Sequence, residues 1–271
     1  MIPLPAGFAA RARDVRVPVP ARDAATVMLV RQEAGDLEVY MLRRTPSMAF
    51  APGAYVFPGG SVDERDASPD VAWAGPDATE LGRVLSAPPE LARALACAAV
   101  RETFEESGVL LAGPSAGTVL SDTCTDDWEE DRLALLARSL SLAELLGRRG
   151  LVLRADLLRP WARWITPEIE ERRYDTRFFA AMLPAGQRTR AVGGEADKVA
   201  WLRPGAALDA ARAGEISLLP PTAVTLGELN AFGSVPGVLT ARRQLVPWQP
   251  EVTLVDGDAW LTLPEGVAYP L

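Results

Sequence analysis

The stretch between Pro88 and Gly108 constrains the fold of this chain more than any other. Two adjacent prolines open it, the 18 residues from Glu90 to Ser107 contain neither glycine nor proline, and a glycine closes it. Proline is favoured in the first turn of a helix, and glycine is favoured in the left-handed position just after the last turn. The pattern therefore predicts a long helix over 90–107 that ends at Gly108.

Short apolar and β-branched runs on both sides of this helix are typical of strands. Residues 24–31 and 37–44 flank a turn at 33–36 and predict a hairpin, and we expect further strands over 54–57, 109–111, 161–165, 177–183 and 199–202. We expect further helices over 126–139, 142–148, 206–213 and 222–232, and a last hairpin from 252–255 and 259–263. Strands that alternate with helices favour an α/β or α+β sandwich, here as a single domain over residues 1–271.

Three segments have the character of additions to this domain. Residues 61–89 are acidic and contain several prolines, so we expect a surface excursion with one short helix around 79–86. Residues 125–150 predict a helical insertion between strands, and residues 233–271 predict a C-terminal extension.

The composition excludes several classes of function. The 271 residues include no histidine, which excludes an imidazole base and an imidazole metal ligand. Only Cys97 and Cys124 are cysteines, and their separation excludes zinc ribbons, iron–sulfur clusters and a disulfide framework. The net charge of −8 disfavours binding to nucleic acid or to an anionic membrane, and no apolar run approaches the ~18 residues of a membrane span. We expect a cytoplasmic protein in which a carboxylate does the acid–base chemistry.

Three carboxylates share one face of the expected helix. At ~100° per residue, Glu105 and Glu106 fall roughly 60° and 40° to either side of Glu102, while the opposite face carries apolar side chains such as Val100 and Phe104. Carboxylates this close repel one another, and a hard divalent cation such as Mg²⁺ or Mn²⁺ relieves that repulsion with oxygen ligands. The alternative is a solvated acidic face that is paired with Arg101 and other arginines.

The sequence around these carboxylates resembles the Nudix hydrolase box, G-x5-E-x7-R-E-U-x-E-E-x-G-U, where U is apolar. It reads Arg101-Glu102-Thr103-Phe104-Glu105-Glu106-Ser107-Gly108-Val109 and follows a turn at Gly59-Gly60. Asp66 stands where the box has its first glutamate, Thr103 replaces an apolar residue, and about 27 extra residues precede Arg101. A box interrupted at this point, with Phe57-Pro58 before the glycines, resembles the coenzyme A diphosphatase-type branch of that family.

The resemblance implies a fold, a reaction and a set of site residues. The fold is the Nudix α/β/α sandwich with a mixed sheet, and the reaction is attack of water on a diphosphate with Mg²⁺ or Mn²⁺ as cofactor. The implied metal ligands are the carbonyl of Gly60 and the side chains of Glu102, Glu105 and Glu106. The implied catalytic residues are Glu105, Glu106 and Arg101, and Arg101 orients the glutamates. The resemblance also implies a carboxylate base. Glu195 is the best match for it, and Glu168 and Glu170 are the alternatives.

A second motif, before the glycine turn, bears on the substrate. At this point the branch has the motif L-L-T-x-R-[SA]-x3-R-x3-G-x3-F-P-G-G. This chain keeps Arg44, Gly53 and Phe57-Pro58-Gly59-Gly60 of that motif. It has Thr45 where the motif has serine or alanine, and Ala49 in place of the second arginine. The resemblance implies that Arg44, Phe57 and Gly59 bind substrate. Arg172, Arg173 and Arg177 are candidates to supply the positive charge that is missing at Ala49. The alternative is that these arginines pair with neighbouring acidic residues and do not bind substrate.

The resemblance also implies coenzyme A or acyl-coenzyme A as the small-molecule diphosphate substrate. ADP-ribose, a dinucleotide or a nucleotide sugar is the alternative for the same chemistry, and a non-catalytic nucleotide-binding Nudix module is the alternative of another class. Homodimer formation is common in the family, but no residue of this sequence specifies it.

Overall fold

The hairpin near the N-terminus forms the centre of the main sheet. In the computed structural model, which describes residues 1–5, 7–14, 17–46, 51–190 and 196–271, strands β2 (Arg22–Glu33) and β3 (Asp36–Arg44) pair antiparallel. The first half of β2 pairs instead with β5 (Gly59–Ser61), so that Gly60 lies opposite Ala25. On its other side β2 runs parallel to β10 (Tyr174–Met182). The sheet is therefore mixed, as expected.

Further strands extend this sheet on both sides. The order is β12-β4-β3-β2-β10-β9-β13, and β11 also pairs with β3. These strands are β4 (Ala54–Val56), β9 (Arg159–Ile165), β11 (Ala196–Leu202), β12 (Ser217–Leu218) and β13 (Pro247–Trp248). The strands expected over 54–57, 161–165, 177–183 and 199–202 thus all belong to one sheet.

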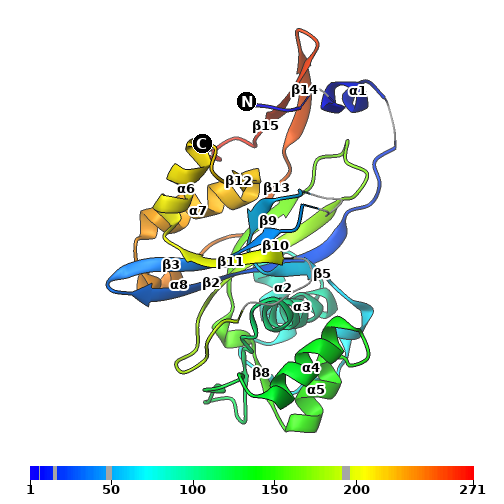
Figure 1. Cartoon of the computed structure of the whole chain (residues 1–271). Helices are drawn as coiled ribbons and strands as arrows, with labels where there is room; N and C mark the ends of the chain where they lie inside the picture. Colours follow the sequence, from blue (N-terminus) through cyan, green and yellow to red (C-terminus); the bar gives the residue numbers. More distant parts are fainter. Residues whose placement is uncertain (6, 15–16, 47–50, 191–195) are drawn as a thin grey trace.

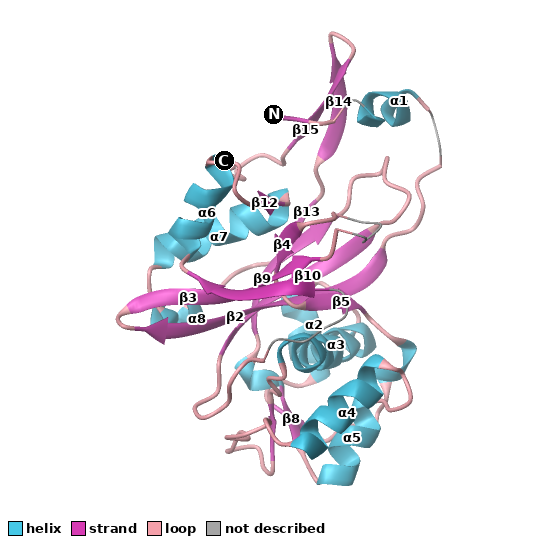
Figure 2. Ribbon diagram, viewed as in Figure 1, coloured by secondary structure: helices cyan, strands magenta, loops and turns pink. Residues whose placement is uncertain are grey.

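Helices cover both faces of this sheet (Figures 1 and 2). Alternate residues of β2 point to opposite faces: Val27 and Leu29 belong to the apolar cluster that includes α3 (Pro89–Ser107), and Met28 and Val30 belong to the cluster on the other face. The first face also carries α2 (Ala78–Leu85), α4 (Asp126–Leu136) and α5 (Leu142–Arg149), and the second carries α6 (Pro204–Arg212), α7 (Pro220–Phe232) and α8 (Val235–Thr240). The α/β/α sandwich is confirmed.

The segment 61–89 contains the short helix that the sequence predicted around 79–86, but it is more than a surface excursion. It forms the 3₁₀ turn η1 (Glu64–Ala67), the short strand β6 (Trp73–Ala74) and α2. Val71, Leu81 and Leu85 are buried in the cluster around α3. Most residues of the segment are exposed or half-buried, as expected, but α2 is amphipathic and places its apolar side against α3, so part of the segment enlarges the core.

Residues 109–111 do not form the expected strand. The side chain of Gln187 replaces a neighbouring strand there: its Oε1 accepts the Leu110 N–H at 2.9 Å, and its Nε2 donates to the Leu110 carbonyl at 2.9 Å. The chain then enters a small sheet of order β6-β8-β7, made of β6, β7 (Ala112–Gly113) and β8 (Val152–Arg154), which a second 3₁₀ turn, η2 (Ala155–Leu157), follows.

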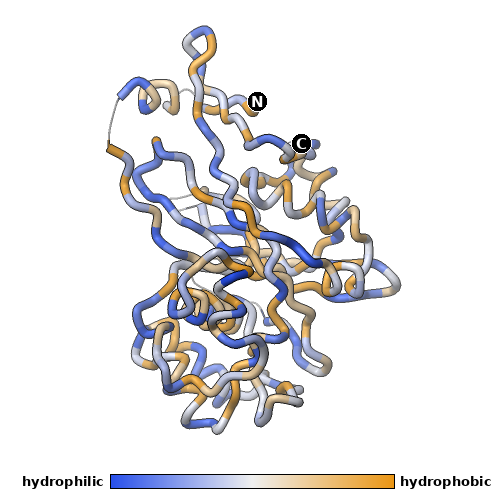
Figure 3. Tube along the Cα trace, turned by 180° about the vertical axis from the view of Figure 1, so that it is seen from behind, coloured by the Kyte–Doolittle hydropathy of each residue, from blue (hydrophilic) through white to orange (hydrophobic). Residues whose placement is uncertain are grey.

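The two ends of the chain meet in a third sheet. Strand β1 (Ile2–Pro3) pairs with β15 (Asp258–Thr262), which forms the expected last hairpin with β14 (Glu251–Val255). Helix α1 (Gly7–Arg13), which the sequence did not predict, packs against both strands of the hairpin. The hairpin projects from the main sheet and carries apolar and hydrophilic stretches (Figures 1 and 3). No helix in the described part of the chain is long and apolar enough to cross a membrane.

Candidate active site

The carboxylates of α3 lie against the glycine turn because α3 packs across β2 and β5. The helix begins at Pro89 and ends before Gly108, which has a φ of 75°, as the sequence predicted. The N–H of Gly59 donates to Glu106 Oε2 at 2.9 Å. This bond joins the last turn of the helix to the turn that opens β5.

Neither glycine of this turn has room for a side chain. A Cβ on Gly60 would overlap the carboxylate of Glu102, and a Cβ on Gly59 would lie 2.5 Å from the carbonyl oxygen of Ala25. The main chain therefore approaches the helix as closely as glycine permits. The Glu102 carboxylate and the main chain of Gly60 are neighbours, which is what the proposed pair of metal ligands requires.

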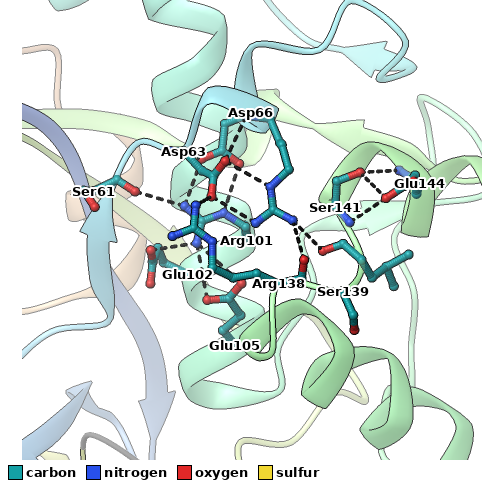
Figure 4. Close-up of polar contacts among 12 residues, drawn as sticks. Ser61, Asp63, Asp66, Arg101, Glu102, Glu105, Arg138, Ser139, Ser141 and Glu144 are labelled. Atoms are coloured by element: carbon teal, nitrogen blue, oxygen red, sulfur yellow. Dashed lines mark hydrogen bonds and ion pairs between the residues drawn. The ribbon is translucent and has the colours of Figure 1, made fainter.

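Arg101 organises the acidic side chains around it (Figure 4). Its Nε and Nη2 each lie 2.9 Å from an oxygen of Asp66, and Nη2 also donates to the Ser61 carbonyl at 3.0 Å. Its Nη1 donates to Glu102 at 2.7 Å and lies 3.3 Å from Glu105. One buried guanidinium thus holds carboxylates from α3 and from the segment inside the box.

Glu105 is the most buried of the three glutamates. Burial, together with the negative charge of Glu102, raises the pKa of the Glu105 carboxyl to about 7, although Arg101 opposes the shift. A nearby cation would stabilise the charged form of this carboxylate, because it would offset both causes of the shift.

The donors in this region fit a hard divalent cation in kind. They are carboxylate and carbonyl oxygens, the ligands that Mg²⁺ and Mn²⁺ prefer. As they stand, no three acidic or cysteine side chains of the described residues form a group that could hold a metal ion. Glu102 and Glu105 face Arg101, and Glu106 faces the Gly59 N–H. A cation at this site must therefore compete with Arg101 for the carboxylates.

The C-terminal end of α3 is held by residues that the sequence did not single out. Arg132 of α4 is buried, and its Nη1 donates to the carbonyl of Glu105 at 2.8 Å. Glu129 pairs with Arg132 and, at 2.7 Å, with Arg190. The hydroxyl of Tyr40 donates to the carbonyl of Arg190 at 3.1 Å. The helical insertion thus fixes the turn that carries Glu105 and Glu106.

An open cavity of about 2150 Å³ lies over the carboxylates. Most residues that the sequence singled out line it: Arg44, Phe57, Gly59, Gly60, Arg101, Glu102, Glu105, Glu106 and Arg172. The candidate base Glu195 and the departure at Ala49 lie outside the described residues. Ala196, which follows Glu195 in the chain, lines the cavity and pairs with Arg44 across β11 and β3.

Two of the arginines chosen for their charge do not line this cavity. Arg173 donates to the carbonyls of Thr166 and Val19 at 3.0 and 2.8 Å. Arg177 is 2% exposed and pairs with Asp23 and Asp175 at 2.9 and 3.0 Å. Arg177 therefore corresponds to the alternative of pairing with acidic residues, whereas the hydrogen bonds of Arg173 go to uncharged protein groups.

The competing base candidates differ in position. Glu170 lines the cavity, and its carboxylate forms an ion pair with Arg11 of α1 at 2.9 Å. Glu168 is exposed, does not line the cavity, and accepts a hydrogen bond from Gln249 at 3.3 Å. Of these two, Glu170 is the carboxylate that faces the cavity.

Comparisons with known proteins match this chain to Nudix proteins. Residues 77–229 match the family model described as the NUDT19 Nudix domain. The acyl-coenzyme A diphosphatase NUDT19 of Gallus gallus is 30% identical over 92% of this chain and 80% of its own length. The protein of the same name from Xenopus laevis is 25% identical over 89% of this chain and 73% of its own length. The crystal structure of a NUDIX hydrolase from Alicyclobacillus acidocaldarius is similar with a TM-score of 0.70 and 29% identity, covering 83% of this chain and 98% of that one.

Proposed function

This chain belongs to the Nudix hydrolase family, and we propose that it splits the diphosphate bond of coenzyme A or an acyl-coenzyme A. The products are 3′,5′-ADP and (acyl-)phosphopantetheine. The observation that carries this proposal is the single cavity in which the Arg101-bound glutamates, the glycine turn and the side chains of Arg44 and Arg172 come together.

The proposed metal ligands are the carbonyl of Gly60 and the carboxylates of Glu102, Glu105 and Glu106. These ligands would hold Mg²⁺ or Mn²⁺, which would neutralise charge on the diphosphate and lower the pKa of the attacking water. Arg101 restrains the carboxylates of Glu102 and Glu105, and Asp66 restrains Arg101. These contacts hold Glu102 and Glu105 beside the glycine turn before a cation binds, and a cation would have to displace Arg101 from part of each carboxylate.

We propose that a carboxylate oxygen accepts the proton of the attacking water, since the chain contains no histidine. Glu195 is the first candidate and Glu170, which lines the cavity, is the second. Exchange of each for glutamine distinguishes them: the variant that lacks the base loses kcat by ~10²-fold or more, while the other keeps its turnover number.

The substrate class is proposed from charge and from the named relatives. The relatives from Gallus gallus and Xenopus laevis are acyl-coenzyme A diphosphatases by name. Coenzyme A carries a 3′-phosphate besides its diphosphate, and arginine is suited to both groups. We propose that Arg44 and Arg172 contact phosphate oxygens, with Phe57 and Gly59 shaping the wall beside them. Arg173 and Arg177 are left out of the proposal because their partners are protein groups.

A substrate panel tests this function. The protein is incubated with Mg²⁺ and coenzyme A, dephospho-coenzyme A or ADP-ribose, and the products are identified by mass spectrometry. We expect kcat/KM at least tenfold higher for coenzyme A than for its dephospho form, and loss of all turnover with EDTA. Equal rates with and without the 3′-phosphate would instead support a dinucleotide or nucleotide-sugar pyrophosphatase. No turnover of any substrate would support a nucleotide-binding module.

Two arginine variants sharpen the panel. Arg44→Met and Arg172→Met should raise KM for coenzyme A, and the variant that loses the 3′-phosphate contact should raise it more for coenzyme A than for dephospho-coenzyme A. Arg203→Met is the matched control, because Arg203 is exposed, does not line the cavity, and pairs with Asp36. Its KM should equal that of the wild type.

A further inference from the structure

The cavity continues far beyond the carboxylates. Its volume of about 2150 Å³ exceeds the ~300–1,000 Å³ of an ordinary small-molecule site. Leu4, Phe8, Val252 and Leu261 line it together with the glutamates of α3. Since these residues belong to the terminal sheet and to α1, one continuous space joins the proposed diphosphate site to the two ends of the chain.

The terminal sheet presents an apolar face to this space. Val252 lies opposite Leu261 in the β14–β15 hairpin, and Leu261 lies opposite Ile2 of β1. The N–H of Leu4 donates to the carbonyl of Ala259 at 3.0 Å, which continues the pairing one step past β1. Residues two apart in a strand share a face, so Leu4 follows Ile2 along the same side.

Helix α1 adds an aromatic ring and fastens this wall to the rest of the site. The guanidinium of Arg11 lies 4.0 Å from the centre of the Phe8 ring and pairs with Glu170 at 2.9 Å. Arg13 donates to the carbonyl of Gly257 at the tip of the hairpin at 3.0 Å. The terminal sheet, α1 and the loop after β9 are therefore tied together around the cavity.

A buried donor lies in the same lining. Trp164 of β9 is 3% exposed and lines the cavity, and its indole N–H has no hydrogen-bond partner among the described residues. A buried N–H without an acceptor is costly.

We propose that the terminal sheet and α1 form the wall of a subsite for the acyl chain of a thioester substrate. This inference rests on the proposed function, since it assigns the apolar end of the molecule whose diphosphate lies at the glutamates. Leu4, Phe8, Val252 and Leu261 contact the chain. Burial of each methylene group should tighten binding by about three- to fourfold.

Acyl-pantetheines test this subsite without hydrolysis, because they contain no diphosphate. Binding of S-butanoyl-, S-hexanoyl- and S-octanoyl-pantetheine is measured by calorimetry with the full chain. For the wild type, Kd should fall by about tenfold with each added pair of methylene groups. Val252→Trp fills the subsite and should remove that dependence, raising Kd for the octanoyl compound at least tenfold.

Thr253→Trp is the matched control, because Thr253 is exposed on the opposite face of the same strand and does not line the cavity. It should keep the wild-type dependence on chain length. If Val252→Trp does not fold, as judged by circular dichroism, Phe8→Ala carries the same test with an expected loss of about fivefold for the octanoyl compound. A Kd that is independent of chain length in the wild type, or equal effects at positions 252 and 253, would overturn the proposal.

The two proposals fail in different ways. If the substrate panel shows no turnover of any coenzyme A compound while the acyl-pantetheines still bind with the expected dependence on length, the proposed function is wrong and the apolar subsite stands. If coenzyme A is cleaved but chain length has no effect on Kd, the function stands and the subsite is wrong.

Discussion

Arg101 and Asp66 form a two-point ion pair, with both nitrogen–oxygen distances at 2.9 Å and both side chains buried. Asp66 precedes Arg101 by 35 residues and stands where the family box has glutamate. The turn η1 packs against α3, which brings the shorter aspartate within reach. The ion pair between Asp66 and Arg101 therefore forms although about 27 extra residues lie between the two parts of the box. Within those extra residues, α2 and Val71 pack into the core around α3.

Exchange of Asp66 for asparagine should destabilise the protein. The variant leaves a buried guanidinium with less negative charge around it, which should lower the free energy of unfolding by about 2–3 kcal/mol. Urea unfolding at pH 7 measures the loss. Asp70→Asn is the control, because Asp70 belongs to the same segment but is exposed. If both variants unfold at the wild-type urea concentration, the pair does not stabilise the fold.

The two glycines of the turn should respond differently to alanine. In Gly59→Ala the new methyl group meets main-chain atoms of Ala25 and Thr26, which cannot move aside, so stability should fall by about 1–3 kcal/mol. In Gly60→Ala it meets the carboxylate of Glu102, which can rotate aside at the expense of its 2.7 Å bond to Arg101, so stability should fall less than in Gly59→Ala while Mg²⁺-supported turnover falls. Thermal unfolding and kcat of both variants measure this. Equal loss of stability in the two would contradict it.

Local signals in the sequence were sufficient to predict α3. Two prolines, an uninterrupted run and Gly108 specify where the helix begins and ends, and the spacing of its acidic residues specifies their common face. These features lie within about twenty residues, so no tertiary contact has to be known. The longer strands of the main sheet were predicted for the same reason, because each has its own apolar pattern and turn residues. The short strands β5, β12 and β13 were not predicted, because two or three residues carry no such pattern.

The parts that could not be predicted depend on contacts between distant residues. Arg132 reaches the carbonyl of Glu105 from 27 residues away, and Tyr40 reaches Arg190 from 150 residues away. No periodic pattern marks such contacts. The pairing of Arg177 with Asp23, 154 residues earlier, was likewise invisible. Charge alone made that arginine a candidate for substrate binding, whereas burial and its partners give it a position inside the protein.

Exchange of Arg132 for methionine should loosen the end of α3. Methionine keeps the buried apolar stem but removes the donor to the Glu105 carbonyl, which should cost about 2 kcal/mol and lower Tm by roughly 4–8 °C. Differential scanning calorimetry measures the shift. Arg212→Met is the control, since Arg212 is an exposed residue of α6 with a surface ion pair to Asp209. A control variant as unstable as Arg132→Met would show that the loss is not specific to α3.

Glu106→Gln should separate catalysis from folding. The amide oxygen can still accept the Gly59 N–H, so Tm should stay within about 2 °C of the wild type. Loss of the negative charge from the proposed metal site should lower Mg²⁺-supported kcat by ~10²-fold or more. Glu90→Gln is the control, because Glu90 lies at the first turn of the same helix and also lines the cavity. Full turnover by Glu106→Gln would remove this carboxylate from the mechanism.

The stability that Asp63 contributes should depend on pH in the acid range. A hydrogen bond from the Arg65 side chain, with a smaller effect of Arg138, holds the pKa of the Asp63 carboxyl well below its ordinary value of 3.8, although burial opposes the shift. The folded protein therefore favours the charged form more than the unfolded chain does. This stabilisation is fully present above pH ~4 and is lost as the pH falls toward the lowered pKa.

Asp63→Asn isolates this contribution. Asparagine keeps an oxygen that can accept the Arg65 N–H at the start of η1 but carries no charge. We expect the variant to melt at a lower temperature than the wild type at pH 7, and the difference in Tm to shrink at pH 2.5, because the Asp63 carboxyl of the unfolded wild-type chain is then protonated and must lose that proton on folding. Thermal unfolding of both proteins between pH 2.5 and 7 measures the difference. A difference that stays constant over this range would show that the charge of Asp63 does not stabilise the fold.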